Sequence, residues 1–236
     1  MRSHYRFWPR RLPHSIVPPQ TPLWDNLAIS ARRYPDKSAL VFFGRTMSYR
    51  ALAVAAERMA AYLHQLGVRK GDRVLLCMQN CPQLVLAHFA ILRANAVVVP
   101  VNPMNRAEEL KHYIADPQAR VAITTADLAA ELAQASNVLP MQQRLQHLLV
   151  TRFTDAFDAD AAGSDAPPPG WKDWLCTSHE LPTLDGGAVR CMAGSRPWPA
   201  PRLCQTCWWA PTTWRCCPTP AAPRGCPRGA CTRTVR

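Results

Sequence analysis

Six cysteines near the C-terminal end are the residues whose type and spacing come nearest to a metal site. They are Cys204, Cys207, Cys216, Cys217, Cys226 and Cys231. A structural zinc site needs two pairs of ligands, each presented by a short turn. Only Cys204 and Cys207 have the Cys-x-x-Cys spacing, and prolines interrupt the sequence on both sides. The cysteines therefore do not favour a zinc site, and we assign no metal ligands.

Other groups able to do chemistry lie in the first half of the chain: His64, His88, His112, Glu108, Glu109, Cys77 and Cys81. Each histidine falls on a separate predicted helix, where a solvated or packed imidazole is the common case. The two glutamates occupy the first turn of a predicted helix and complement its dipole. The two cysteines have no histidine or aspartate partner that the sequence identifies, so we interpret them as small core residues. We predict no catalytic and no cofactor-binding residue in this chain.

The formal net charge of +12 would suggest an anionic partner, but it is unevenly distributed. Residues 186–236 contribute +8, and the first 185 residues carry +4 with acids and bases mixed. We therefore expect no specific nucleic-acid partner. Only three of the ten cysteines precede residue 186, which favours a reducing compartment. No signal peptide or apolar run of membrane-spanning length is present, so we predict a cytoplasmic protein without a membrane span.

Helical and strand patterns alternate through the first 151 residues. The clearest helix is 49–66, where apolar residues recur every three or four positions after Ser48 as N-cap and before Gly67. Further helices are predicted at 24–34, 82–93, 106–115 and 128–135. Strands are predicted at 38–43, 46–48, 73–78, 96–101, 120–124 and 147–151, that at 96–101 as a buried β-branched strand. This alternation predicts an α/β fold with a parallel sheet and crossover helices.

Six short stretches of this region resemble the N-terminal part of the adenylate-forming family, most closely its medium- and long-chain fatty-acid–CoA ligases. They are residues 34–40, 44–52, 67–74, 80–82, 98–103 and 109–110. Each is a structural junction without a catalytic group, but their order and spacing together are specific. One departure is Asn95, where the family more often has glycine before a buried strand.

The composition from Gly186 onwards is that of GC-rich DNA translated out of frame. Residues 186–236 contain no Asp, Glu or Lys, but eight Arg, eight Pro, four Trp and seven Cys. Joining the third nucleotide of each codon to the first two of the next tests this interpretation. From Trp209 the shifted codons permit Gly-Ala-Asp-Asp-Leu-Ala-Val, and from Cys216 they permit Leu-Pro-Tyr-Thr-Ser-Gly-Thr-Thr-Gly-Leu-Pro-Lys-Gly. This second string resembles the phosphate loop of the same family.

The resemblance implies an acid–thiol ligase. A fatty acid reacts with ATP to give an acyl-adenylate, and coenzyme A then displaces AMP. ATP, Mg²⁺ and coenzyme A are thus implied for the intact enzyme. None is expected for this chain, because the loop appears in frame as Pro220-Ala221-Ala222-Pro223-Arg224-Gly225, which lacks the donors and hydroxyls that phosphates need. We therefore predict an inactive N-terminal fragment.

Four segments follow from these patterns. Residues 1–22 form an extended proline-rich arm, 23–152 a truncated N-terminal AMP-binding domain, 153–185 a linker or loop, and 186–236 a disordered, out-of-frame tail whose frame changes between Leu175 and Met192. The alternative function is a non-catalytic interaction or nucleic-acid-binding protein that uses the Arg/Trp/Cys-rich tail, with stacking and phosphate contacts.

Overall fold

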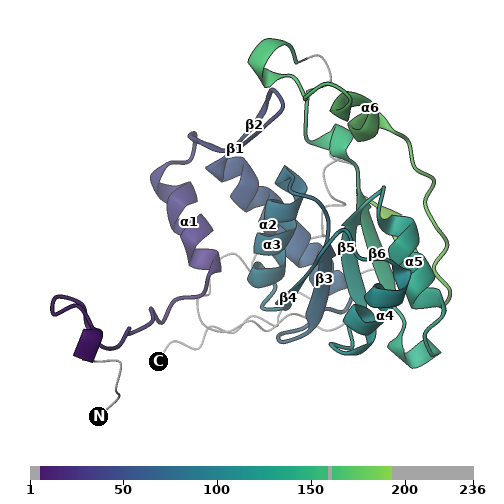
Figure 1. Ribbon diagram of the computed structural model, residues 1–236, viewed down its shortest axis with the longest axis horizontal. Coiled ribbons are helices and arrows are strands. Elements are labelled where there is room, and N and C mark those ends of the chain that lie inside the picture. Colours follow the sequence, from purple (N-terminus) through teal and green to yellow (C-terminus); the bar gives the residue numbers. More distant parts are fainter. Residues whose placement is uncertain (1–5, 159–160, 193–236) are drawn as a thin grey trace, which may run out of the picture. The chain divides into compact units, whose positions relative to one another are not determined.

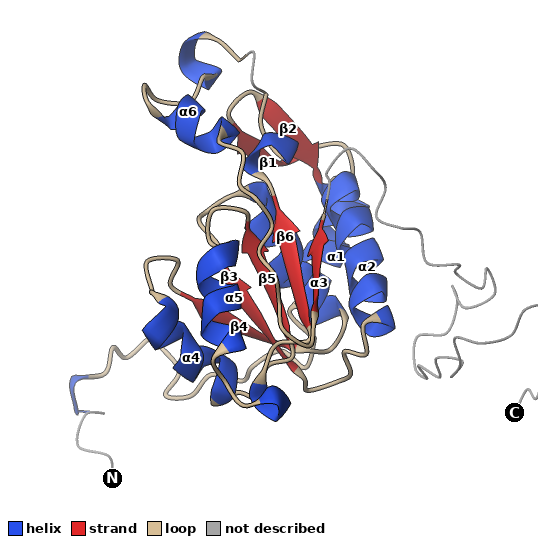
Figure 2. Ribbon diagram, turned by 90° about the vertical axis from the view of Figure 1, so that its right-hand side faces the viewer, coloured by secondary structure: helices blue, strands red, loops and turns tan. Residues whose placement is uncertain are grey.

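Five parallel strands form the central sheet of the computed structural model, which describes residues 6–158 and 161–192 (Figures 1 and 2). In spatial order they are β4 (Val97–Val101), β3 (Arg73–Cys77), β5 (Val121–Thr125), β6 (His147–Thr151) and β7 (Ala188–Cys191). Every neighbouring pair is parallel. The predicted α/β class and parallel sheet are confirmed.

Helices cover both faces of this sheet, as its buried strands require. The helices are α1 (Trp24–Arg33), α2 (Tyr49–Gln65), α3 (Pro82–Arg93), α4 (Ala107–Ala115) and α5 (Ala129–Asn137). Side chains of α1, α2 and α3 join one hydrophobic cluster with Val74, Ile123 and Leu149 of the sheet. Those of α4 and α5 join a second cluster with Leu75 and Leu148. Alternate residues of β3, β5 and β6 thus face opposite layers, and Figure 2 shows helices on both sides of the sheet.

The longest helix, α2, begins and ends where the sequence predicts. The Oγ of Ser48 accepts a hydrogen bond from the N–H of Ala51 at 3.2 Å, which satisfies one of the free donors of the first turn. After the helix, Gly67 has φ of +91°, a conformation that side chains other than glycine rarely adopt. The buried residues Leu52, Ala56, Met59 and Leu63 lie on the face that the spacing predicts.

The expectation of a buried strand at 96–101 is wrong in one respect. Among the strands that the structure describes, β4 lies at the edge of the sheet and pairs only with β3, and Val97 is 47% exposed. Pro100 lies within this strand, and proline is tolerated at an edge because no neighbouring strand needs its missing N–H. A continuous apolar run does not distinguish a central strand from an edge strand.

Residues 153–185, expected to be a linker, contain ordered elements. Short 3-10 turns lie at Phe153–Asp155 and Gly163–Asp165, and a helix, α6, spans Trp171–Cys176. An antiparallel hairpin of β1 (Ser38–Phe42) and β2 (Arg45–Ser48) packs near this segment: Arg45 donates to the carbonyl of Asp155 at 3.0 Å. β7 extends the sheet to Cys191, beyond the expected start of the tail at residue 186. Residues 193–236 lie outside the described residues.

No helix among the described residues is both long and apolar enough to cross a membrane.

Candidate functional site

The carboxyl edge of the sheet contains a topological switch point between β3 and β5. These two strands are neighbours, but the helices that follow them lie on opposite faces: α3 follows β3 and α5 follows β5. The two following loops therefore diverge, which in open α/β sheets leaves a crevice between them. In open α/β sheets, ligands bind in such crevices. The candidate site is built from the residues that line this edge.

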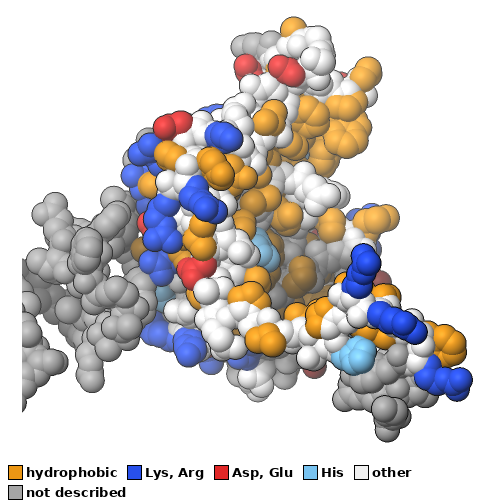
Figure 3. All heavy atoms as spheres, turned by 90° about the vertical axis from the view of Figure 1, so that its left-hand side faces the viewer, with side chains coloured by type: hydrophobic (Ala, Val, Ile, Leu, Met, Phe, Trp, Pro, Cys, Tyr) orange, Lys and Arg blue, Asp and Glu red, His pale blue; other side chains and the backbone are white. Residues whose placement is uncertain are grey.

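An aromatic cleft of about 560 Å³ lies beside the crevice. Phe153 and Trp174 form its centre, with ring centroids 4.7 Å apart, and Trp171 lies 6.1 Å from Trp174. Phe42 of the hairpin and Leu175 complete the apolar lining, while Gln79 and Asn80 of the loop after β3 supply the polar one. Trp171 is 51% exposed and Trp174 is 37% exposed. Figure 3 shows hydrophobic side chains gathered on the upper part of one face.

A smaller cleft of about 210 Å³ adjoins the first and shares Phe153, Trp174 and Leu175 with it. Its polar lining comes from the loop after β5, the end of β6 and the segment after α6: Asp127, Arg152, Thr154, Thr177, Ser178 and His179. Together the two clefts, hereafter the carboxyl-edge cleft, have an aromatic half and a polar half.

Hydrogen bonds fix the strand ends beneath this cleft. The hydroxyl of the fully buried Thr124 donates to the carbonyl of Cys77 at 2.7 Å, which ties β5 to β3. The N–H of Ala126 donates to the carbonyl of Thr151 at 2.9 Å, which ties the loop after β5 to β6. Because the strand ends are held in register, the lining residues have a rigid base.

Several buried oxygen atoms near this edge have no hydrogen-bond partner within the described residues. They are Oε1 of Gln83, Oγ1 of Thr125, Oδ1 of Asp127 and Oδ2 of Asp155. A buried polar atom normally has a partner, because leaving it unpaired costs about 1–3 kcal/mol. Four oxygen atoms without a partner thus lie near the carboxyl edge, whereas Nδ1 of His147, also without one, lies at the start of β6.

Cys77 and Cys81 border the same edge, and their burial disfavours the thiolate form that a nucleophile needs. Burial, with a smaller contribution from the Asp127 carboxylate, raises the pKa of Cys77 to about 11. Burial also raises the pKa of Cys81 to about 11, against hydrogen bonds from Leu84 and Gln83 that lower it. Both side chains belong to the hydrophobic clusters, which agrees with the interpretation of them as core residues.

We therefore expect Cys77 and Cys81 to resist alkylation in the native chain at pH 8, where both thiols remain protonated. Cys176 is exposed and should be modified before either of them. Iodoacetamide labelling followed by peptide mass spectrometry measures both rates, and labelling in 8 M urea is the control that makes all three sites accessible. Equal native rates at Cys77 and Cys176 would show that the burial is absent in solution.

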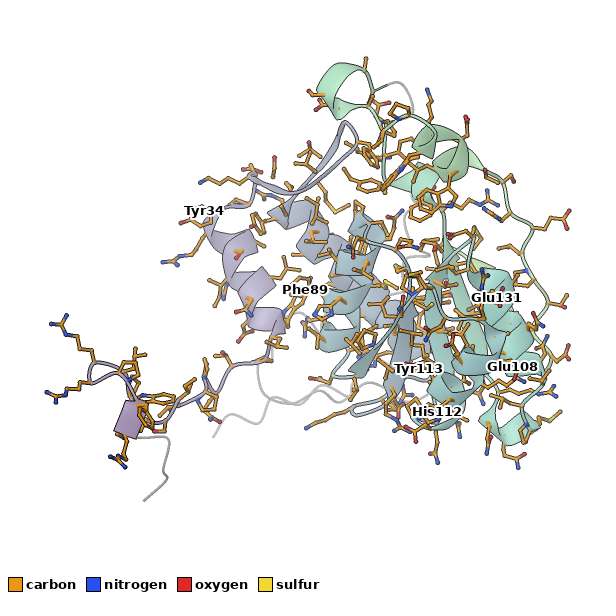
Figure 4. All side chains as sticks on the ribbon, viewed as in Figure 1. Tyr34, Phe89, Glu108, His112, Tyr113 and Glu131 are labelled. Carbon is orange, nitrogen blue, oxygen red and sulfur yellow. The ribbon has the colours of Figure 1, made fainter. Side chains whose placement is uncertain are left out.

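The remaining residues singled out from the sequence do not converge. His64 and His88 lie on α2 and α3, whereas His112 lies on α4 across the sheet. Glu109 accepts a hydrogen bond from the N–H of Arg106 at 3.0 Å, and Glu108 pairs with Lys111 at 2.7 Å, so both stabilise the start of α4. Figure 4 shows Glu108 and His112 near α4, away from Phe89 of α3. These contacts indicate that Glu108 and Glu109 stabilise the start of the helix and do not form an acid–base pair.

The structure identifies one glutamate whose structural role the sequence pattern did not predict. Glu131 of α5 accepts hydrogen bonds from the N–H of Ala107 at 3.0 Å and from Arg106 at 3.2 Å. It thus caps α4 from the neighbouring helix, and Figure 4 shows it on the α5 side. No local signal reveals a cap supplied by a residue 24 positions away.

No group of three or more potential metal ligands occurs within residues 6–158 and 161–192. The six cysteines from Cys204 onwards lie outside the described residues, so the expectations about zinc and nucleic acid remain predictions. The sequence did not indicate the carboxyl-edge cleft, because its aromatic half depends on α6. Its lining combines aromatic and polar side chains, so it can bind or pack against a partner.

The comparisons with known proteins point to one family. A family model described as "AMP-binding enzyme" matches residues 27–185. The long-chain-fatty-acid–CoA ligase of Bacillus subtilis is 37% identical over 117 residues, which are 50% of this chain and 21% of the relative. The enzyme of the same name from Escherichia coli O6:H1 is 37% identical over 150 residues, which are 63% of this chain and 26% of the relative. The chain thus spans about a quarter of the length of these relatives. A solved anthranilate–CoA ligase in complex with anthranoyl-AMP is 27% identical, with a TM-score of 0.53 over 57% of this chain and 25% of that one.

Proposed function

Because this chain belongs to the AMP-binding enzyme family, we propose that it derives from a fatty-acid–CoA ligase and that, as translated, it does not catalyse the reaction. The intact enzyme would activate a fatty acid with ATP and transfer the acyl group to coenzyme A. The names of the B. subtilis and E. coli relatives support this substrate class. The four free cysteines of the described residues fit the cytoplasmic location that we propose.

The observation that carries the proposal is the shifted reading of residues 216–229. It yields a Thr-Ser-Gly-Thr-Thr-Gly run followed closely by a lysine, downstream of the residues that match the family. Backbone N–H groups of such a glycine-rich loop, with hydroxyls and a lysine, suit a triphosphate. A string of this length is a poor candidate for coincidence.

The residues that are present in frame do not fit ATP. Pro220 and Pro223 have no N–H to donate, and Ala221 and Ala222 have no hydroxyl. Mg²⁺ would offset the charge of the leaving pyrophosphate in an intact enzyme, but the in-frame residues 216–229 include no carboxylate to help hold it. The described residues would instead serve as scaffold, with a parallel sheet whose carboxyl edge holds the switch point.

Fatty-acid-dependent ATP–pyrophosphate exchange tests the proposal. Two proteins are compared: the chain as translated, and the product of a gene in which one nucleotide has been inserted to join the first frame to the shifted one and to the sequence that follows. We expect exchange only for the repaired protein, with a gain of at least about 10²-fold, the scale of removing a single key electrostatic group. A repaired protein with alanine in place of the restored loop lysine is the matched control.

Two outcomes would contradict the proposal. Exchange by the unrepaired chain at a comparable rate would refute its inactivity. A soluble, ATP-binding repaired protein that activates aromatic but not aliphatic acids would refute the fatty-acid assignment while keeping the family.

A further inference from the structure

β7 is paired and packed as a native strand, although its residues fall inside the region of unusual composition. Leu148 of β6 pairs with Val189, and Val150 pairs with Cys191. The N–H of Ala188 donates to the carbonyl of Gln146 at 2.9 Å, and that of Met192 donates to the carbonyl of Val150 at 2.7 Å. Parallel pairing of this kind depends on the correct register along the whole strand.

The side chains of β7 also match the two layers of the fold. Val189 packs against the cluster formed with α4 and α5, on the same side as its partner Leu148. Met192, only 8% exposed, belongs to the cluster on the opposite face. A one-residue slip would exchange these faces, so the alternation in this short segment fits the sheet.

Gly187 occupies a position that admits no other residue without displacement. A Cβ atom there would lie 2.8 Å from the carbonyl oxygen of Leu145, 2.9 Å from that of Gln146 and 2.6 Å from Cδ2 of Leu184. Two of these three contacts are with backbone, which cannot move as a side chain does. Five of the 51 residues in 186–236 are glycine, so by chance only about one position in ten there would hold the residue that this site requires.

Hydrogen bonds fix the loop that precedes β7 on both sides of Leu184. The side chain of Asn137 donates to the carbonyl of Thr183 at 3.1 Å and accepts from the N–H of Asp185 at 2.9 Å. Asp185 also lies 3.8 Å from the guanidinium of Arg144. These contacts come from α5 and from the segment before β6, so the approach to β7 is specified by residues far away in the sequence.

Four separate features show that residues 183–192 suit this fold. They are the pairing register of β7, the alternation of its side chains between the two faces, the glycine that steric contacts require at 187, and the hydrogen-bonded loop before the strand. Codons read out of frame carry no selection for any of them. We propose that the native frame continues through Met192 and changes only between codons 193 and 209, the point from which the shifted codons permit residues that resemble the family's sequence before the phosphate loop. This inference rests on the frame change in the proposed function, and it moves the expected interval of 175–192 towards the C-terminus.

Two repaired genes separate the possibilities. In the first, the frame is restored immediately after codon 192, so that β7 is kept; in the second, it is restored immediately before codon 186, so that residues 186–192 are read in the shifted frame. We expect the first protein to be soluble, to melt cooperatively and to bind a fluorescent ATP analogue. The second should give at least about tenfold less soluble protein, because the edge of the sheet loses its strand. A better yield and ATP binding from the second gene would overturn the inference.

Hydrogen–deuterium exchange on the unrepaired chain provides a readout that depends on no repair. The amides of Ala188 and Met192 should exchange at least about tenfold more slowly than in the Gly187→Val variant, since that side chain would displace β7. Equal and fast exchange in both chains would show that β7 is not docked and would remove the basis of the inference. ATP binding without activation of any fatty acid by the first repaired protein would refute the substrate class alone.

Discussion

Replacement of Ile123 by alanine is expected to lower the free energy of unfolding by about 2–5 kcal/mol. Ile123 lies in β5, the central strand of the sheet, and is 0% exposed. Its side chain belongs to the cluster shared with α2 and α3, on the side that carries the largest helix. Loss of three carbon atoms there removes apolar burial and leaves a cavity that two rigid neighbouring strands cannot fill.

The matched control is Ile123→Val, which removes one methyl group and should cost about 0.5–1.5 kcal/mol. Urea unfolding followed by circular dichroism at 222 nm, at pH 7 and constant protein concentration, measures both variants. The ratio of the two effects matters more than either value, because it compares cavities of different size at one site. An alanine variant no less stable than the valine variant would show that the sheet interior is not packed as described.

The elements with strong local patterns could be predicted from sequence, and those that depend on distant contacts could not. α2 and α3 begin where the sequence predicts, since Ser48 caps one and Pro82 occupies the first turn of the other. α6 has only six residues and is positioned by the contact of Trp174 with Phe153. Periodicity cannot identify so short a helix.

Asn95 illustrates a departure from the family pattern that the structure explains. Its φ is +58°, in the left-handed region where glycine is favoured and asparagine is tolerated. Its carbonyl accepts a hydrogen bond from the N–H of Gly71 at 2.9 Å, which joins the turns that precede β3 and β4. The substitution therefore preserves the turn. The backbone requirement is local, but its φ could not be predicted from the residue type alone.

The carboxyl-edge cleft is the part of the candidate site that sequence could not supply. Asp127 and Arg152 follow predicted strands, so their place at the carboxyl edge could be inferred from parallel topology. The aromatic half could not, because it requires α6 to fold back beside Phe42 of the hairpin. Segments over a hundred residues apart meet there, and a periodic pattern in the sequence does not indicate such a contact.

Ser136→Ala is the second large effect that we expect, a loss of about 1–3 kcal/mol in the free energy of unfolding. Ser136 is 0% exposed near the end of α5, and its Oγ accepts a hydrogen bond from the N–H of Leu145 at 3.0 Å. Leu145 is itself buried at 1% exposure, so the alanine variant would leave that N–H without its acceptor in an apolar cluster.

Gln134→Ala is the matched control for Ser136→Ala, because Gln134 lies on the exposed side of the same helix. Its expected effect is within about 0.5 kcal/mol, as for other exposed substitutions. Thermal unfolding of the two variants, with amide exchange measured at Leu145, distinguishes a lost hydrogen bond from a change in helix propensity. Alanine is the better helix former, so propensity alone would stabilise both variants. Destabilisation of Ser136→Ala together with faster exchange at Leu145 would therefore assign the loss to the bond that ties α5 to the start of β6. An unchanged exchange rate would show that water or another acceptor replaces the hydroxyl.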